Sequence, residues 1–284
     1  MSFCCAVLDV RREGYYAWKK RPDKEEKNRE LLSILKKKRE ENPDYGTQSL
    51  IDELTEDKKC SYGKAYKLLK ENNLLCYRRR KPHGNTKSDP KAKKAEDLVN
   101  RKFYAEKPGT KLFTDITEQM CLDGKLYICE VEDAFDGAIV GLAMDDNMRT
   151  PLCTSALLSA QNRFGHEEEC IIHSDHGSQF TSHLYAETAL KNGFVQSMGA
   201  VGSCADNTRI ESFHATLKKE LLYRIPCSKM TRDEVKHAIF EWIEVRYNRT
   251  RRHTSNENNL PPLIKREQYL LAQSEQFPAI QRAA

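Results

Sequence analysis

Three acidic residues, Asp115, Asp175 and Glu211, stand in contexts that suit phosphodiester chemistry. Asp115 and Asp175 end apolar, strand-like runs, and Glu211 lies in a helix-like run. A carboxylate at the end of a buried strand is costly unless something pairs with it, and a divalent cation is the simplest partner. Three carboxylates from separate elements can hold two Mg²⁺ ions that bind phosphate oxygens. An ordinary cap or surface charge explains one Asp alone more simply, but it explains all three together poorly.

A polar stripe surrounds the third acid. At helical spacing, Asn207, Glu211, His214 and Lys218 share one face. A carboxylate, an imidazole and an ammonium group on one stripe suit a site that handles phosphates, so Asn207, His214 and Lys218 are candidate nucleic-acid contacts. For the stripe alone, the alternative is a polar, solvated helix face.

Hydrophobic periodicity from residue 110 onward predicts the elements that position these residues. The strand-like runs cover residues 111–117, 125–134, 138–144, 170–173 and 194–198. The helical runs cover residues 154–164, 182–192 and 208–222, the last of them capped by Asp206 or Asn207. Three strands in a meander, followed by alternating helices and strands, predict an α/β domain: a mixed five-stranded sheet with helices on both faces. Asp115 then lies on the first strand and Asp175 just after the fourth.

Charge divides the chain into a basic front and an acidic rear. Residues 1–110 hold 28 Lys and Arg against 18 Asp and Glu, and residues 111–284 hold 19 against 24. This asymmetry indicates a nucleic-acid-binding module before a carboxylate-rich catalytic module, although charge alone also fits a solvated basic face. No apolar run is long enough for a membrane span, and the N-terminus is a poor signal peptide. The ten cysteines show no Cys-x-x-Cys pair, so we expect a reduced, cytoplasmic, nucleoid-associated protein.

The basic front half has the pattern of a small helical domain. Helical runs cover residues 25–42, 49–56 and 62–72, with Thr47 and Ser61 as N-caps of the last two. Two short helices joined by a break fit a helix-turn-helix, whose second helix enters the major groove. Lys64 and Lys67, with Lys70 beside them, lie on its outer face. Many small helical hairpins share this pattern, so it does not by itself establish DNA binding.

A basic cluster and a linker follow. Arg78, Arg79, Arg80 and Lys81 are adjacent cations that would make salt-sensitive phosphate contacts without reading bases. Residues 83–94 have the composition of a linker, and a helix is expected over residues 95–104.

The motifs resemble those of the DDE transposases and retroviral-type integrases. The segments Phe-Thr-Asp-Ile-Thr, His-Ser-Asp-His-Gly-Ser-Gln-Phe and Ala-Asp-Asn-Thr-Arg-Ile-Glu-Ser-Phe-His carry the resemblance, and 35 residues separate Asp175 from Glu211, as the Asp-Asp-35-Glu signature requires. Over nearly the whole chain, the sequence is most similar to the second-frame transposase subunit of the third numbered family of bacterial insertion sequences. The resemblance implies an RNase H-like core and two Mg²⁺ or Mn²⁺ ions at Asp115, Asp175 and Glu211. It also implies DNA cleavage followed by strand transfer.

The resemblance extends to the C-terminal region and to the partners. Glu244-Val245-Arg246-Tyr247-Asn248-Arg249 resembles the family's tail and adds Arg249, Arg251 and Arg252 to the candidate DNA contacts. Family partners would be double-stranded DNA at the element ends and the target, further copies of the chain on that DNA, and an upstream-frame subunit or fusion. The sequence departs from the family pattern at Ala205, at residues 135–137 and at residues 256–259.

We therefore expect five segments: a lead-in (1–24), a helix-turn-helix domain (25–82), a linker and helix (83–107), a catalytic core (108–225) and a C-terminal helical basic tail (226–284). The predicted function is transposition of insertion-sequence ends by a two-metal mechanism. Two alternatives stay open: a purely hydrolytic nuclease of the same fold, which leaves no joined product, and a non-catalytic DNA-binding repressor or decayed copy, which needs no metal.

Overall fold

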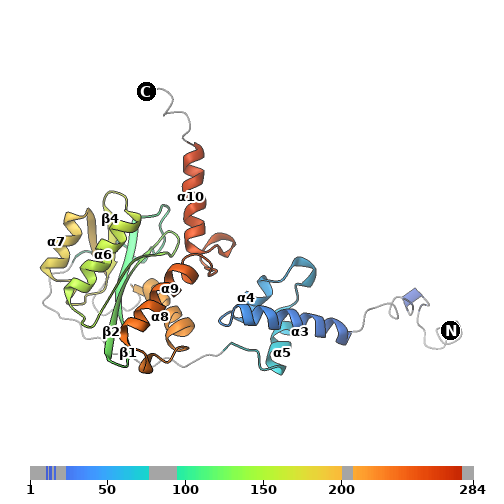
Figure 1. Ribbon diagram of the computed structural model, residues 1–284. Helices are drawn as coiled ribbons and strands as arrows, with labels where there is room; N and C mark the ends of the chain where they lie inside the picture. The colour runs from blue at the N-terminus through green and yellow to red at the C-terminus, as the bar shows by residue number, and fades with distance from the viewer. Residues whose placement is uncertain are drawn as a thin grey trace. The chain divides into compact units, whose positions relative to one another are not determined.

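The chain divides into two units, residues 1–82 and 83–284, in the computed structural model (Figure 1). The structure describes residues 24–76, 95–199 and 207–276, together with residues 11, 13, 14 and 16. The division falls at the start of the linker predicted over residues 83–94. The predicted phosphate contacts Arg78, Arg79, Arg80 and Lys81 lie outside the described residues.

The first unit, in its described part, consists of three helices around a small apolar core. These are α3 (Lys24–Glu41), α4 (Thr47–Asp52) and α5 (Tyr62–Glu71), with a 3-10 turn, η1 (Glu56–Lys58), before α5. The buried apolar side chains are Leu31, Leu35, Leu50, Ile51, Leu54, Ala65 and Leu69. They come from all three helices and from the turn after α4, so the helical hairpin α4–α5 is packed against α3.

The boundaries of α4 differ from the prediction at both ends. Thr47, predicted as the N-cap, is the first residue of the helix, and Gly46 takes the cap position without a side-chain bond. Thr47 is buried, so its side chain belongs to the packed face of the helix. The helix ends at Asp52 because Leu54 turns into the core, and this turn interrupts the helical run predicted to reach Glu56.

The second unit is built on a mixed five-stranded sheet. Its strands are β1 (Lys111–Cys121), β2 (Gly124–Asp133), β3 (Ile139–Asp145), β4 (Cys170–Ser174) and β5 (Phe194–Met198). The spatial order is β3-β2-β1-β4-β5. The first three strands form an antiparallel meander, and β4 and β5 add in parallel to β1. The predicted mixed sheet is therefore confirmed.

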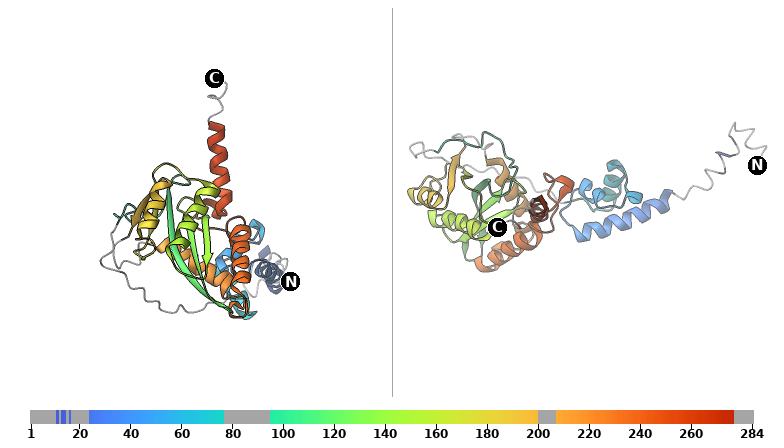
Figure 2. Two further views of the ribbon diagram at one scale, coloured as in Figure 1. Left: turned by 60° about the vertical axis from the view of Figure 1, so that its left-hand side comes forward. Right: turned by 90° about the horizontal axis from the view of Figure 1, so that it is seen from above.

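Helices cover both faces of this sheet (Figures 1 and 2). On one face lie α6 (Thr150–Phe164) and α7 (His183–Lys191), packed over Leu112, Val131 and Ile172. On the other face, α8 (Thr208–Leu217) and α9 (Arg232–Glu241) pack over Phe113 and Ile128. Two π-helical turns, η3 (Lys218–Leu222) and η5 (Trp242–Tyr247), extend α8 and α9, and short 3-10 turns lie at η4 (Cys227–Lys229) and η6 (Glu257–Asn259).

The C-terminal region, predicted as a helical basic tail, packs in its described part against the rest of the second unit. Val235, Ile239, Trp242 and Tyr247 belong to the same apolar core as the inner side of α8. The Asn248 side chain bonds both the N–H and the C=O of Ile139, at 2.9 and 3.0 Å, and so completes the start of β3. The region is therefore part of the catalytic unit.

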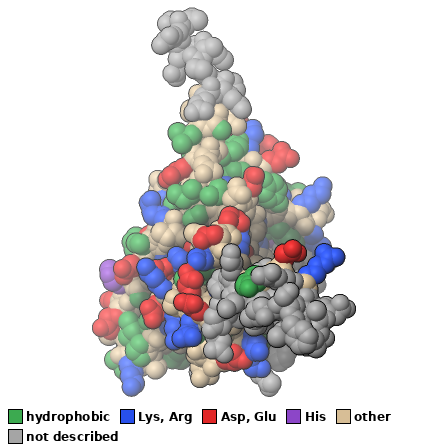
Figure 3. Space-filling view, turned by 90° about the vertical axis from the view of Figure 1, so that its right-hand side faces the viewer, with side chains coloured by type: hydrophobic (Ala, Val, Ile, Leu, Met, Phe, Trp, Pro, Cys, Tyr) green, Lys and Arg blue, Asp and Glu red, His purple; other side chains and the backbone are tan. Residues whose placement is uncertain are grey.

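The last described helix, α10 (Pro262–Gln276), is anchored at its start and exposed further along. Leu263 and Arg266 are buried, whereas Leu270 and Leu271 are more than half exposed. Figure 3 shows hydrophobic side chains on this helix near the top of the view. Among the described helices, none is both long and apolar enough to cross a membrane.

The helix predicted over residues 95–104 is absent. Asp97 Oδ1 accepts hydrogen bonds from the N–H groups of Val99 and Asn100, at 2.9 and 3.0 Å. The Leu98 N–H donates to Ser197 Oγ at 3.0 Å, and Asn100 and Arg101 adopt positive φ angles. The backbone groups that a helix would pair internally are thus used in a turn and in contacts beside β5.

Candidate active site

Asp115 lies in the middle of β1 and not at its end. The strand continues to Cys121 because it pairs with β2 along its whole length, through the turn before Gly124. Asp115 stands opposite Glu130 of β2, two residues after the fully buried Phe113. Alternation along the strand therefore places Asp115 on the face that α8 covers.

Asp175 follows directly after β4. Its Oδ1 atom accepts a hydrogen bond from the Gly177 N–H at 2.8 Å, and a Cβ at residue 177 would lie only 3.0 Å from that oxygen. Because β4 runs parallel to β1, the chain leaves β4 in the direction in which β1 passes Asp115. The charge of Asp175 raises the pKa of Asp115, so the two acids lie within electrostatic range of each other.

The electrostatic setting makes ionisation of Asp115 unfavourable. Burial raises the pKa of this carboxyl to about 6, His214 lowers it, and the nearby charge of Asp175 raises it further. A buried carboxyl whose ionisation is opposed by the charge of a neighbouring carboxylate is stabilised in its ionised form by a bound cation.

Glu211 is not assembled with the two Asp residues. It lies in the first turns of α8 with an exposed side chain. In the parts of the chain that the structure describes, no three His, Cys, Asp or Glu side chains form a group that could hold a metal ion. Residues 200–206, which lead into α8, lie outside the described residues.

A buried His–Glu pair stands beside Asp115. His214 Nε2 lies 2.8 Å from Glu130 Oε2, and its Nδ1 lies 3.7 Å from Asp115 Oδ2. Burial lowers the pKa of His214, but Glu130 and Asp115 more than offset this, so the net pKa is raised. His214 therefore lies between two carboxyls that favour its protonated form. Sequence reasoning missed Glu130, although the Asp123-Gly124 turn sets the register that places it opposite Asp115.

The predicted stripe on α8 is split by the packing. Asn207 and His214 are buried, Lys218 is half-buried, and Glu211 is exposed. Asn207 occupies the N-cap position without capping the helix, and its Nδ2 donates to the Thr114 carbonyl at 3.3 Å. The start of α8 is thereby tied to the residue before Asp115.

A second ion pair holds α8 on the sheet. Arg209 Nε donates to Glu132 Oε1 at 2.8 Å, and its Nη1 donates to the Phe103 carbonyl at 2.8 Å. Burial raises the pKa of Glu132 to about 7, and Arg209 lowers it. Neither residue was singled out from sequence, because nothing local marks a surface arginine as the partner of a buried strand acid.

The candidate DNA contacts have different surroundings. Lys64 and Lys67 are exposed on α5, and Arg249 is exposed beyond η5. Arg252 is half-buried. Arg251, by contrast, donates from Nη2 to Glu220 Oε1 at 2.7 Å and stacks over Tyr247, so its guanidinium stabilises the fold.

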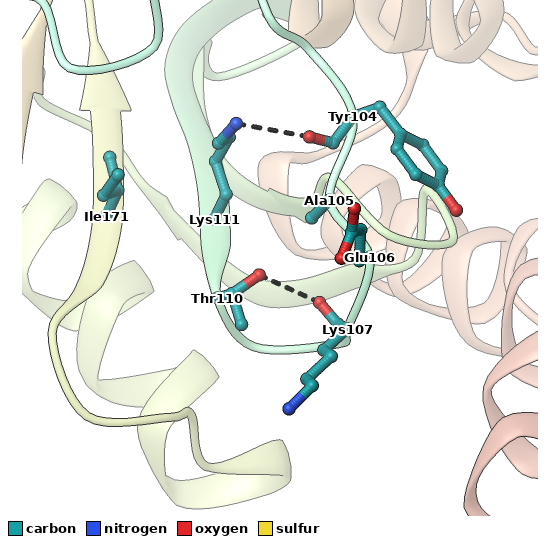
Figure 4. Close-up of a pocket in the computed structure, with 7 residues that line it drawn as sticks. All are labelled: Tyr104, Ala105, Glu106, Lys107, Thr110, Lys111 and Ile171. Atoms are coloured by element: carbon teal, nitrogen blue, oxygen red, sulfur yellow. Dashed lines mark hydrogen bonds between the residues drawn. The ribbon is translucent and has the colours of Figure 1, made fainter.

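A cavity of about 380 Å³ lies away from the acids, at the start of β1 (Figure 4). Thr110, Lys111 and Ile171 line it, and Lys111 pairs with Ile171 at the first rung of the β1–β4 ladder. Lys111 Nζ donates to the carbonyls of Lys102 and Tyr104, at 2.8 and 3.2 Å. The cavity is therefore not part of the acidic site.

Comparison with known proteins gives consistent matches. Two family profiles, both described as Integrase core domain, match residues 105–204 and 192–262. The chain is 34% identical over 271 residues to the insertion element IS600 uncharacterized 31 kDa protein of Shigella sonnei, covering 93% of this chain and 98% of that one. It is 29% identical over 263 residues to the transposase InsF for insertion sequence IS3A of Escherichia coli (strain K12), covering 88% of each.

Solved structures also match part of the chain. The catalytic core domain of HTLV-2 integrase, in complex with magnesium in a trimeric form, is 18% identical, with a TM-score of 0.45. The match covers 57% of this chain and 99% of that one. With the integrase core matches and the observed strand order, the predicted RNase H-like fold is confirmed.

Proposed function

The chain belongs to the insertion-sequence transposases, which carry an integrase core domain, and we propose that Asp115, Asp175 and Glu211 are the carboxylates of its active site. As a polynucleotidyl transferase it carries out transposition by DDE-type catalysis. Our proposal concerns which residues do this and how. The observation that carries it is the placement of Asp115 and Asp175 on the parallel strand pair β1–β4, where the charge of Asp175 raises the pKa of Asp115.

The donor set fits a hard divalent cation. Asp115 and Asp175 offer carboxylate oxygens, the ligands that Mg²⁺ and Mn²⁺ prefer, and the cost of placing two like charges in half-buried positions near each other supports binding of a cation there. We propose two ions per active site, with Glu211 completing the second. When bound, they would activate a water or a DNA 3′-hydroxyl and stabilise the leaving oxygen.

The protein's own residues prepare this site. His214, held by Glu130, lies beside Asp115 and fixes its orientation, and Asn207 ties the start of α8 to β1. Glu211 lies on the same helix, between the two anchored residues Asn207 and His214.

The partners we propose are double-stranded DNA at the element ends and the target, and further copies of the chain on that DNA. A further proposed partner is the product of an upstream reading frame, either as a separate subunit or fused to this chain. The exposed cations Lys64, Lys67 and Arg249 and the half-buried Arg252 support the DNA assignment, and we add Asn207, His214 and Lys218 of α8 to the proposed contacts. We do not include Arg251 among the proposed DNA contacts, because its guanidinium forms an ion pair with Glu220.

Replacement of Glu211 by Gln tests the proposal, because it keeps size and removes charge. We expect Glu211→Gln to lose end cleavage and strand transfer by at least about a hundredfold while binding labelled element ends normally. Glu241→Gln, a change at an exposed glutamate at the end of α9, is the matched control and should retain activity.

The same assay separates the alternatives. Cleaved but unjoined ends from the parent protein would point to a nuclease. Binding without cleavage, together with no heat of Mg²⁺ or Mn²⁺ binding in calorimetry, would point to a repressor. If Glu211→Gln joins ends as fast as the parent, the assignment of Glu211 is wrong.

A further inference from the structure

Two tyrosines stand exposed and stacked at the start of α5. Tyr62 is 52% exposed and Tyr66 is 39% exposed, and their ring centroids lie 5.9 Å apart with planes 15° from parallel. The opposite side of the helix carries Ala65 and Leu69, which are fully buried in the first unit's core. In a unit with so small a core, two large aromatic rings on the solvent-exposed side of a helix indicate a surface that binds a partner.

Gly63 lies between them in sequence and has no evident role in the fold. A Cβ at this position would meet no atom within 4 Å, so no packing within the described structure excludes a side chain. The residue is helical, so no left-handed backbone conformation requires glycine. Glycine weakens a helix relative to alanine. A glycine that costs helix stability and serves no contact inside the protein fits a surface that another backbone or base must approach closely.

The charge around this surface is positive. Lys64, Lys67 and Lys70 are exposed on the same helix. Lys67 lies 3.9 Å from Glu71, but both side chains are more than half exposed, so solvent screens that pair strongly. Aromatic rings flanked by lysines on one helix are complementary to a polyanion with flat bases.

The helix is presented on a rigid support. The Ser61 hydroxyl accepts a hydrogen bond from the Lys64 N–H at 3.4 Å and so caps α5 as predicted. Beyond the other end of the helix, Arg39 of α3 donates from Nε to the Leu74 carbonyl at 3.0 Å and from Nη1 to the Tyr45 carbonyl at 2.6 Å. Both ends of α5 are thus fixed before any partner arrives.

We propose that Tyr62, Gly63 and Tyr66 form the surface that reads bases in the major groove of double-stranded DNA, and that Lys64, Lys67 and Lys70 contact phosphates beside it. The major groove admits a helix, and the N-terminal residues of a recognition helix contact base edges. The rings would lie on thymine methyl groups and base edges, and Gly63 would let the helix backbone sink into the groove. This inference rests on the proposed function and adds to it the residues that determine sequence specificity.

The test is binding of the full chain to two fluorescent duplexes of equal length: the terminal sequence of its own element, and a scrambled sequence of the same composition. We expect Gly63→Ala, and separately the double variant Tyr62→Ala/Tyr66→Ala, to bind the terminal duplex about tenfold or more weakly. Binding to the scrambled duplex and the salt dependence should stay unchanged. Lys64→Ala/Lys67→Ala should weaken binding to both duplexes and flatten the salt dependence.

The matched control is Gly46→Ala in the same unit, another exposed glycine with no atom near its missing Cβ. It should leave the preference for the terminal duplex intact. Thermal melting checks folding: Gly63→Ala should melt no lower than the parent, so that lost binding cannot be ascribed to unfolding. If both variants keep the parent's preference for the terminal duplex, the inference is overturned while the proposed function stands. If the parent binds neither duplex, the DNA-acting function fails and the inference falls with it.

Discussion

Arg266 on α10 is buried against two carboxylates, those of Asp133 and Asp136. Its Nε and Nη2 atoms lie 2.7 Å from Asp136 Oδ2 and Asp133 Oδ2, and all three side chains are under a tenth exposed. Removing one partner of a buried ion pair costs about 3–5 kcal/mol, because the other charge stays buried and unpaired. Arg266→Met leaves two such carboxylates, so we expect the free energy of unfolding to fall by an amount at the upper end of that range. This is a large part of the roughly 5–15 kcal/mol by which a typical domain is stable.

The loss must depend on pH. Burial, and then the neighbouring Asp136, raise the pKa of the Asp133 carboxyl above its ordinary value, and Arg266 lowers it. Without Arg266 this folded-state pKa rises further above the unfolded value. A group of this kind contributes stability at low pH and loses it as pH rises through the folded pKa. The destabilisation should therefore be smaller near pH 5 than near pH 8, by about 1.4 kcal/mol for each unit of added shift.

Urea unfolding followed by far-ultraviolet circular dichroism at both pH values measures the effect. Asp136→Asn added to Arg266→Met is the matched rescue, because it removes one of the two stranded charges and can keep the bond that Asp136 Oδ1 accepts from the Ala138 N–H at 2.8 Å. It should recover about 1–2 kcal/mol near pH 8. A loss under about 1 kcal/mol, or one equal at both pH values, would refute the reasoning.

Two further predictions concern the sheet. His214→Phe should cost about 3–5 kcal/mol by stranding the buried Glu130 carboxylate, and adding Glu130→Gln should restore part of it; additive losses in a double-mutant cycle would contradict the pairing. Gly141→Ala should cost at least about 1–3 kcal/mol, because its Cβ would collide with the Ala156 carbonyl where α6 crosses β3; denaturation that matches the parent's would exclude such close packing.

Much of the catalytic unit was predictable because its signals are local. Alternating or continuous apolar runs mark β2, β4 and β5, and Ser182 caps α7 through its bond to the Tyr185 N–H, with Gly193 beyond the helix end at positive φ. Local signals failed where packing decided the outcome. The predicted first strand stops at residue 117, before the polar Glu118 and Gln119, yet pairing with β2 carries β1 on to Cys121.

The electrostatic partners in the site were not predictable for the same reason. The roles of Glu130 and Arg209 can be assigned only once the hairpin register and the placement of α8 are known, because each bonds a residue far away in sequence. The fixed spacing between Asp175 and Glu211 made the acids recognisable, but spacing does not say how far Glu211 lies from the other two. Residues 200–206 before it are outside the described part.

Two departures from the family pattern contact each other in the structure. Asp136, in the first departing segment, offers its carbonyl to Asn256 Nδ2 at 2.8 Å, and Asn256 begins the second departing segment. Gly137 allows His253 to pack against the turn, since a Cβ there would lie 2.6 Å from His253 Nε2. These contacts join the β2–β3 turn to the segment before α10.

The sharing of one apolar core between α8 and the C-terminal region bears on the fate of incomplete copies. Val235, Ile239 and Trp242 cover side chains that would otherwise face water. A reading frame interrupted after residue 225 would yield a polypeptide in which this apolar surface is exposed to water. Such a polypeptide would be prone to aggregation and proteolysis. We therefore expect the protein products of such truncated gene copies to be degraded, so that they do not accumulate and inhibit the intact enzyme.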